Sequence, residues 1–287
     1  MEKECTNKVE PGILYLVPTP IGNLSDMTER AVTILKHVDL VAAEDTRHTR
    51  ILLNHFDITS RVISYHEHNK KEAGGKIIAA LKEGMSVAQC SDAGMPVISD
   101  PGADLVKLAI EEGIPIVPLP GPNAALTALV ASGLDARQFT FIGFLPKITA
   151  KKKKLFAGIG HVPTTLIFYE APHRLVETLK VLCKELGNRK AVLARELTKK
   201  FETFKRGNLK ELLSGLEMEP PRGEYVILVE GWNEDFSEKS DGDTDWHEAA
   251  KELALDLSVK EASRQIALQY NLSRREVYQY LVVEEKE

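Results

Sequence analysis

Short apolar runs alternate with amphipathic stretches through the first 120 residues. Helical periodicity covers residues 26–35, 72–82 and 103–112, and Asp26 with Glu29 is predicted to form a capping box at the first of these helices. Between the helices lie β-branched and apolar runs that predict buried strands at residues 13–17, 39–43, 61–64, 86–90 and 114–119. This alternation is typical of a parallel or mostly parallel sheet with helices on its faces.

The pattern loosens after residue 121. A small-residue helix is predicted at residues 124–131, followed by strands at residues 139–144, 165–169, 191–195, 201–205 and 224–230. More strands with fewer helices between them indicate a second α/β domain with a mixed sheet. We therefore expect an α/β protein of two α/β domains, at residues 12–121 and 122–231.

The last part of the chain has a different character. Residues 232–243 are acidic and lack apolar periodicity, which predicts a linker. Residues 244–287 contain three short helical patterns, at residues 246–257, 259–270 and 273–283. The second and third patterns resemble a helix-turn-helix, with a turn at Asn271 and with Arg274, Arg275 and Gln279 facing outward. An RNA contact and a small packing or dimerisation module both fit this spacing.

Composition excludes several classes of protein. The chain is 43% hydrophobic and 28% charged with a net charge of −5, so neither bulk disorder nor general electrostatic binding of nucleic acid is expected. Its three cysteines are widely spaced, which argues against a disulfide framework or a zinc site. A charged N-terminus and the absence of an apolar run of about 18 residues predict a cytoplasmic protein without a membrane segment.

Candidate chemistry lies in the segments that follow the predicted strands, where ligands of open α/β sheets bind. Six such segments are predicted to be loops: PTPIGN, EDTRHTR, SDAGMPVISDPG, PGPN, YEAPHR and RELTKK. The glycine fingerprints of nicotinamide and P-loop domains, the hydrolase elbow and the zincin motif are all absent. The run His66-Glu67-His68 lacks a third ligand at suitable spacing, so no metal site is predicted.

These segments carry a resemblance to a known family. Residues 14–35, 42–56, 91–102, 118–129, 168–175, 194–202 and 222–231 resemble the small-subunit ribosomal RNA (cytidine-2′-O)-methyltransferases, a branch of the tetrapyrrole-methylase-like enzymes that use S-adenosylmethionine. The resemblance spans about residues 12–231, and EDTRHTR and YEAPHR are specific to this branch. It implies two α/β domains with the cofactor in the cleft between them.

The resemblance also assigns residues to roles. The implied contacts to S-adenosylmethionine are Pro20, Asp92, Ala93, Met95, Asn123, Ala124, Ala125, Tyr169 and Leu197. A base must take the proton of the acceptor hydroxyl, and Glu44, Asp45, His48, Glu170, Glu196 and Lys199 are candidates. Glu170 is preferred, with Lys199 as a polarising partner. A buried structural carboxylate paired with arginine is the alternative for Glu170 with Arg174 and for Asp45 with Arg47 or Arg50. Simple helix packing is the alternative for Ala124 and Ala125.

RNA is the substrate that the resemblance implies. Residues expected to hold it at the cleft rim are Asp45, Arg47, His48, Arg50, His173, Arg174 and Arg195, and Lys147 with residues 151–154 adds a basic patch. A solvated lysine-rich helix start is the alternative for this patch. The expected reaction is 2′-O-methylation of a decoding-site cytidine of 16S rRNA in the small ribosomal subunit, by a homodimer. A tetrapyrrole-like small-molecule methyltransferase and a non-catalytic RNA-binding assembly factor are the alternatives.

Overall fold

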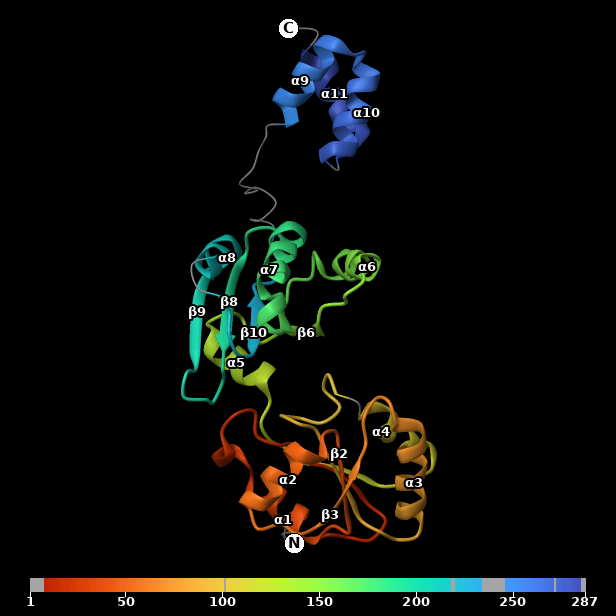
Figure 1. Cartoon of the computed structure of the whole chain (residues 1–287). Helices are drawn as coiled ribbons and strands as arrows, with labels where there is room; N and C mark the ends of the chain where they lie inside the picture. Colours follow the sequence, from red (N-terminus) through yellow and green to blue (C-terminus); the bar gives the residue numbers. More distant parts are fainter. Residues whose placement is uncertain (1–7, 101, 218–219, 234–245, 271, 285–287) are drawn as a thin grey trace, which may run out of the picture. The chain divides into compact units, whose positions relative to one another are not determined.

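The computed structural model describes residues 8–100, 102–217, 220–233, 246–270 and 272–284. The chain divides into two compact units, residues 1–232 and 233–287 (Figure 1). Most of the linker predicted at residues 232–243 lies outside the described residues.

The first sheet of the larger unit is entirely parallel. Its strands are β1 (Leu14–Leu16), β2 (Leu40–Ala43), β3 (Arg61–Ser64), β4 (Val87–Cys90) and β5 (Ile116–Pro118), in the order β3-β2-β4-β1-β5. Strands β2 and β4 are buried along their whole length, as expected for a sheet covered on both faces. The parallel sheet predicted from the sequence is confirmed.

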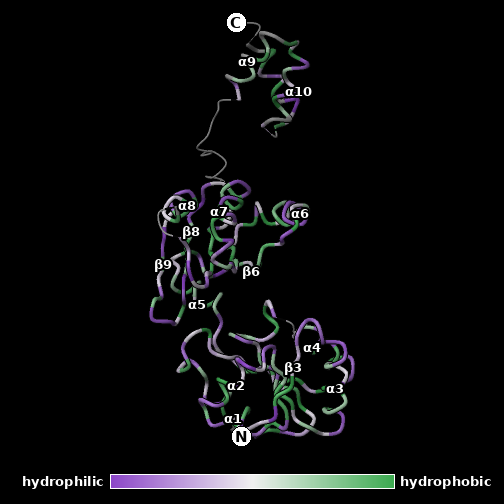
Figure 2. Tube along the Cα trace, viewed as in Figure 1, coloured by the Kyte–Doolittle hydropathy of each residue, from purple (hydrophilic) through white to green (hydrophobic). Residues whose placement is uncertain are grey.

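Helices cover both faces of this sheet. The helical elements between its strands are the 3₁₀ turn η1 (Leu24–Asp26), α1 (Glu29–His37), α2 (Thr46–His55), α3 (Lys70–Lys82) and α4 (Ala103–Glu111). Ile34 of α1 and Leu53 of α2 pack on one face with Tyr15, whereas Ile77 of α3 and Leu105 of α4 pack on the other face with Leu14. Figure 2 shows the hydrophobic strands of this sheet between helices that carry more hydrophilic residues.

Two sequence predictions in this region are wrong. Thr28, not Asp26, caps α1, because its hydroxyl accepts the Ala31 N–H at 3.1 Å while Asp26 belongs to η1. The segment EDTRHTR is not a loop, since Asp45 caps α2 and the helix begins at Thr46. Asp, Arg and Thr suit the first turn of a helix as well as a polar loop, so composition alone did not separate the two.

The second sheet is mixed, as predicted. It contains β6 (Phe139–Phe144), β7 (Thr165–Glu170), β8 (Lys190–Arg195), β9 (Thr203–Asn208) and β10 (Tyr225–Val229), in the order β6-β7-β10-β8-β9. Only the β6–β7 pair is parallel. The helices of this layer are α5 (Ala124–Ser132), α6 (Thr149–Ile159), α7 (Pro172–Leu186) and α8 (Leu209–Glu217).

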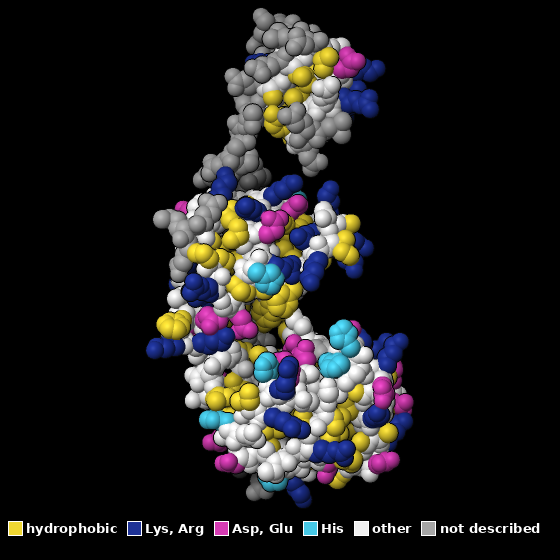
Figure 3. All heavy atoms as spheres, viewed as in Figure 1, with side chains coloured by type: hydrophobic (Ala, Val, Ile, Leu, Met, Phe, Trp, Pro, Cys, Tyr) yellow, Lys and Arg dark blue, Asp and Glu magenta, His cyan; other side chains and the backbone are white. Residues whose placement is uncertain are grey.

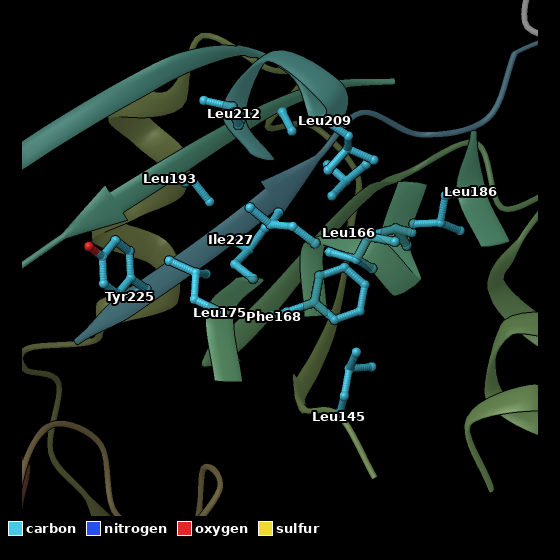
Figure 4. Close-up of a cluster of buried hydrophobic side chains, with 14 of the residues drawn as sticks. Leu145, Leu166, Phe168, Leu175, Leu186, Leu193, Leu209, Leu212, Tyr225 and Ile227 are labelled. Atoms are coloured by element: carbon cyan, nitrogen blue, oxygen red, sulfur yellow. The ribbon is translucent and has the colours of Figure 1, made fainter. Parts of the chain in front are cut away.

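Alternation along β7 distributes its side chains between two cores. Leu166 and Phe168 point into a cluster with α6, α7 and α8, and Ile167 points into a second cluster with α5. Figure 4 shows Phe168 among Leu145, Leu175 and Ile227 in the larger cluster. Helix α5 and the three other helices therefore lie on opposite faces of the sheet.

The smaller unit is a three-helix module. Helices α9 (Trp246–Asp256), α10 (Val259–Tyr270) and α11 (Arg274–Glu284) bury Ala250, Ala262, Ile266, Val277 and Leu281 together. Arg274, Arg275 and Gln279 are exposed, and the predicted turn residue Asn271 lies outside the described residues. Across the described part of the chain, no helix combines the length and the apolar character needed to cross a membrane.

Candidate active site

A cavity of about 550 Å³ opens in the larger unit. Segments after β2 and β4 form one part of its wall, and the second sheet with the start of α5 forms the other. Figure 3 shows a hollow on this face, with apolar surface inside and basic, acidic and histidine side chains at its edge. The residues that line the cavity are Ile21, Glu44, Asp92, Ala93, Gly94, Met95, Ile98, Ser99, Asp100, Asn123, Ala124, Phe144, Tyr169, Glu170, Ala171, Pro172, Ala194, Leu197, Glu224, Tyr225 and Val226.

Most of the expected cofactor residues meet at this cavity. Those that line it are Asp92, Ala93, Met95, Asn123, Ala124, Tyr169 and Leu197. Pro20 instead lines a neighbouring cavity of about 180 Å³ together with His48. Ala125, the second residue of α5, is buried in the cluster with Ile167 and Val226, which agrees with the packing alternative for that residue.

The start of α5 is fixed by two side chains of the cavity wall. Asn123 accepts the Leu126 N–H at 3.0 Å, and the hydroxyl of Tyr169 accepts the Ala125 N–H at 3.2 Å. Both bonds use N–H groups that have no partner inside the helix. Burial raises the pKa of Tyr169, so its hydroxyl stays protonated while it holds α5 against β7.

The charge of the cavity wall is negative. Burial, followed by the charge of Asp92, raises the pKa of Glu44, and burial together with Glu44 and Asp92 raises the pKa of Asp100 to about 7. Asp92 accepts the Asp45 N–H at 2.9 Å and lies 3.7 Å from Nδ1 of His48. Among the described residues lining the cavity, none is lysine or arginine. The wall therefore suits a ligand that carries positive charge.

Glu170 reaches the cavity, but its carboxylate is already engaged. The residue is 2% exposed, and its oxygens accept the Thr178 hydroxyl at 2.6 Å and the Ala171 N–H at 3.0 Å. Nε of Arg174 lies 3.5 Å away and Arg174 also donates to the Leu145 carbonyl. These partners hold the end of β7 to the start of α7. The geometry favours the structural alternative over the role of a base.

The variant Glu170→Gln tests that assignment. It removes the ion pair with Arg174 from a buried site, so we expect the free energy of unfolding to fall by about 1–3 kcal/mol. Chemical denaturation measures this, with Glu177→Gln on the exposed face of α7 as the matched control. Unchanged stability combined with a loss of methyl transfer of roughly 100-fold or more would instead identify Glu170 as the base.

Lys199 lies in an ion-pair network at the edge of the cavity. Its Nζ binds Glu196 at 3.0 Å and Glu224 at 2.8 Å, and it does not contact Glu170. Burial disfavours the charge of Lys199, but the hydrogen bonds that its ammonium donates to Glu224 and Glu196 outweigh burial and raise its pKa. An ammonium held in this way is a poor proton acceptor, which argues against Lys199 as the base.

Gly22 allows the loop that follows β1 to lie close to this network. A Cβ at Gly22 would lie 2.5 Å from Cγ of Lys199 and 3.0 Å from the Leu197 carbonyl oxygen. Only a residue without a side chain allows this approach. PTPIGN and RELTKK therefore contact one another beside the cavity.

The expected RNA-binding residues lie outside the main cavity. Asp45 and Arg47 pair with each other, which lowers the pKa of Asp45, and Arg47 is exposed on the first turn of α2 with His48 and Arg50. His173 and Arg174 lie on the first turn of α7, so YEAPHR is not a loop. The Arg195 side chain donates to the Arg222 carbonyl at 2.8 Å. Residues 151–154 lie on α6, in agreement with the alternative of a lysine-rich helix start.

Two acidic residues of the cavity did not emerge from sequence reasoning. Asp100 lies in the segment SDAGMPVISDPG and Glu224 in the segment at residues 222–231, but neither segment assigned a role to these two residues. Their positions depend on packing between segments distant in sequence.

Comparison with known proteins places these features in context. The profile of the family described as Tetrapyrrole (Corrin/Porphyrin) Methylases matches residues 13–213. Ribosomal RNA small subunit methyltransferase I of Bacillus subtilis is 48% identical over 278 residues, covering 94% of each chain, and that of Escherichia coli O157:H7 is 43% identical over 272 residues, again covering 94% of each chain.

Solved structures agree in fold. A uroporphyrin-III C-methyltransferase from Thermus thermophilus in complex with S-adenosyl homocysteine has a TM-score of 0.54 at 21% identity, covering 75% of this chain and 96% of that one. Diphthine synthase has a TM-score of 0.58 at 14% identity, covering 76% of this chain and 90% of that one. At these identities the likeness concerns the fold alone.

Proposed function

The chain belongs to the small-subunit ribosomal RNA methyltransferase I family within the tetrapyrrole methylases, and from this membership we propose that it methylates 16S rRNA of the small subunit. The methyl donor is S-adenosylmethionine and the acceptor is the 2′-oxygen of a decoding-site cytidine. The observation that carries the proposal is a cavity lined by the family's segments, next to exposed basic side chains.

The residues of the cavity fit S-adenosylmethionine. When bound, this donor supplies an electrophilic methyl group on a positively charged sulfur. Ile21, Leu197 and Val226 offer apolar walls for an adenine ring, and the acidic side chains of Glu44 and Asp92 suit the positive charges. Backbone carbonyl and amide groups of residues 92–95 and the start of α5 complete the set of polar partners. The chain's own task is to orient donor and acceptor.

RNA is held by groups beside the cavity. Arg47 and Arg50 project from α2, and His173 is exposed on the first turn of α7. Guanidinium groups bind phosphate with two parallel hydrogen bonds, and a helix N-terminus favours anions. The patch at residues 151–154 on α6 adds further cations. These local charges attract RNA although the net charge is −5.

The proposal extends to organisation and location. We assign residues 12–121 and 122–231 to two α/β domains and residues 244–287 to a module that contacts RNA or a second copy of the chain. The active species is a homodimer, and its site of action is the cytoplasm, where small subunits are found. Leu126 and Val130, which are 46% and 79% exposed on the outer face of α5, support an interface of this kind.

Two other functions fit less well. A tetrapyrrole-like substrate needs no cationic rim, and the exposed arginines of α2 give no benefit to such a reaction. A non-catalytic assembly factor has no need for a donor-sized acidic cavity, and its RNA binding is independent of the donor. Both alternatives remain outcomes of the test.

The experiment incubates the purified chain with radiolabelled S-adenosylmethionine and small subunits from cells that lack the enzyme. Label in the 16S rRNA is the expected result. Donor binding without label transfer to RNA returns the small-molecule reaction to consideration, and salt-dependent RNA binding without donor binding supports the assembly factor.

A further inference from the structure

Asp100 is an acidic residue of the cavity that is not among the expected cofactor contacts, bases or RNA-binding residues. It stands near the end of the segment SDAGMPVISDPG, which connects β4 to α4, and its side chain lines the cavity with Ser99 and Ile98. It is half-buried and interacts electrostatically with Tyr169 of β7 as well as with Glu44 and Asp92. The carboxylate therefore lies where both walls of the cavity meet.

The backbone before Asp100 is strained. Val97 and Ser99 adopt φ values of 77° and 66°, in the left-handed region that non-glycine residues avoid. For β-branched Val97 this conformation is unusual, and each such residue costs about 1–3 kcal/mol. Strain of this size persists only where surrounding contacts impose it, and it is concentrated at functional sites.

Contacts on both sides of Asp100 impose that conformation. Gly143 lies where the pairing of β6 with β7 shifts register, and its φ is 70°. It leaves space for Ser99, since a Cβ on residue 143 would lie 2.9 Å from the Ser99 hydroxyl oxygen. Gly102 leaves no room for a Cβ beside Gln89 and Val97, and its N–H donates to the Asp100 carbonyl at 2.9 Å. Asp100 is thus held between two close contacts.

Other carboxylates of the cavity have partners that occupy them. Glu170 is bound by Thr178 and Arg174, and Glu224 by Lys199. Asp92 accepts the Asp45 N–H, and Glu44 accepts the Asp92 N–H. Among the described residues, only the Ser91 hydroxyl, which also lies 3.2 Å from the Gly94 carbonyl oxygen, interacts with Asp100 as a side-chain donor, which leaves acceptor capacity on the two carboxylate oxygens.

We propose that Asp100 is the general base that takes the proton of the 2′-hydroxyl during methyl transfer. This rests on the proposed function of the cavity. The O–H bond breaks and its proton goes to a carboxylate oxygen of Asp100. The electron pair of that bond forms the new bond from the 2′-oxygen to the methyl carbon, and the sulfur–methyl bond breaks with its electron pair left on sulfur. Charge balances, because the sulfonium and the carboxylate both become neutral.

The ionisation of Asp100 suits this role. Burial, Glu44 and Asp92 raise its pKa to about 7, so that it accepts a proton more readily than an exposed aspartate and is still ionised above neutral pH. His66 faces Glu44, and His48 faces Asp92. The deprotonated carboxylate is the active form, so the rate is expected to rise with pH through about 7 and then to level off.

The test compares Asp100→Asn with Asp104→Asn, which changes an exposed aspartate on the first turn of α4. Single-turnover transfer to small subunits at saturating S-adenosylmethionine should fall by about 10²–10⁴-fold in Asp100→Asn and remain unchanged in Asp104→Asn. Calorimetric donor affinity should stay within about threefold of the original. The variant should also lose the rise in rate with pH, and Glu44→Gln should shift the midpoint of that rise to lower pH.

Distinct outcomes overturn the inference. An Asp100→Asn enzyme with the original rate and pH profile shows that the base is another group. A loss of donor affinity of roughly 100-fold with an unchanged pH profile assigns Asp100 to holding the donor's ammonium group instead. If the unaltered chain binds the donor but does not methylate subunits, the proposed function itself fails, independently of Asp100.

Discussion

Replacing Ala124 with tryptophan should weaken the binding of S-adenosylmethionine by at least about 100-fold, or roughly 2.8 kcal/mol. Ala124 is the first residue of α5, and it lines the cavity with Asn123 and Tyr169. An indole at this position occupies space that the donor needs. The helix start itself should persist, because its capping bonds come from Asn123 and Tyr169.

Ala131→Trp is the matched control for this experiment. Ala131 is exposed on the same helix but does not line the cavity. Titration calorimetry should give the original donor affinity for the control and little or no binding for Ala124→Trp, with both variants folded. Equal donor affinities for the two variants would show that the donor binds elsewhere.

Replacing Phe168 with alanine should lower the free energy of unfolding by about 3–5 kcal/mol. Phe168 is fully buried at the centre of the second sheet, where it packs among Leu145, Leu175 and Ile227 (Figure 4). The loss combines the transfer free energy of the ring with the cavity left in a closely packed core. Since domains have a total stability of about 5–15 kcal/mol, the variant should be only marginally folded at 37 °C.

Phe139→Ala provides the comparison within the same sheet. Phe139 begins β6 and is 42% exposed, so the same truncation creates no enclosed cavity there and should cost less than about 1 kcal/mol. Urea denaturation of both variants measures the difference. Equal losses would contradict the assignment of the core to the cluster around Phe168.

Local patterns in the sequence contain most of the fold. Short apolar runs mark strands β2 and β4 because both are buried on two faces, and the period of α10 marks a helix whose observed bounds agree with the predicted ones. The errors occur where a polar segment suits two structures. Residues 44–50 supply the cap and first turn of α2, although Asp, Thr and Arg are equally common in loops.

The site was predictable as a group of segments but not as a set of roles. Asn123 and Tyr169 line the cavity as expected, since they belong to the segments PGPN and YEAPHR. Glu170 was chosen as a base because of its position at a strand end, whereas its hydrogen bonds to Thr178 and Ala171 come from the packing of α7. Asp100 was missed because its burial depends on β6 and β7, which lie more than 30 residues further along the chain.

The most direct measurement identifies the methylated atom. Small subunits reconstituted with 16S rRNA that lacks the modification are methylated with radiolabelled donor and digested to nucleosides, alongside subunits with 2′-deoxycytidine at the acceptor position. The account predicts label in 2′-O-methylcytidine from the first sample and none from the second. Label on a base atom, or equal labelling of the deoxy subunits, would contradict the assignment of the 2′-oxygen as the acceptor.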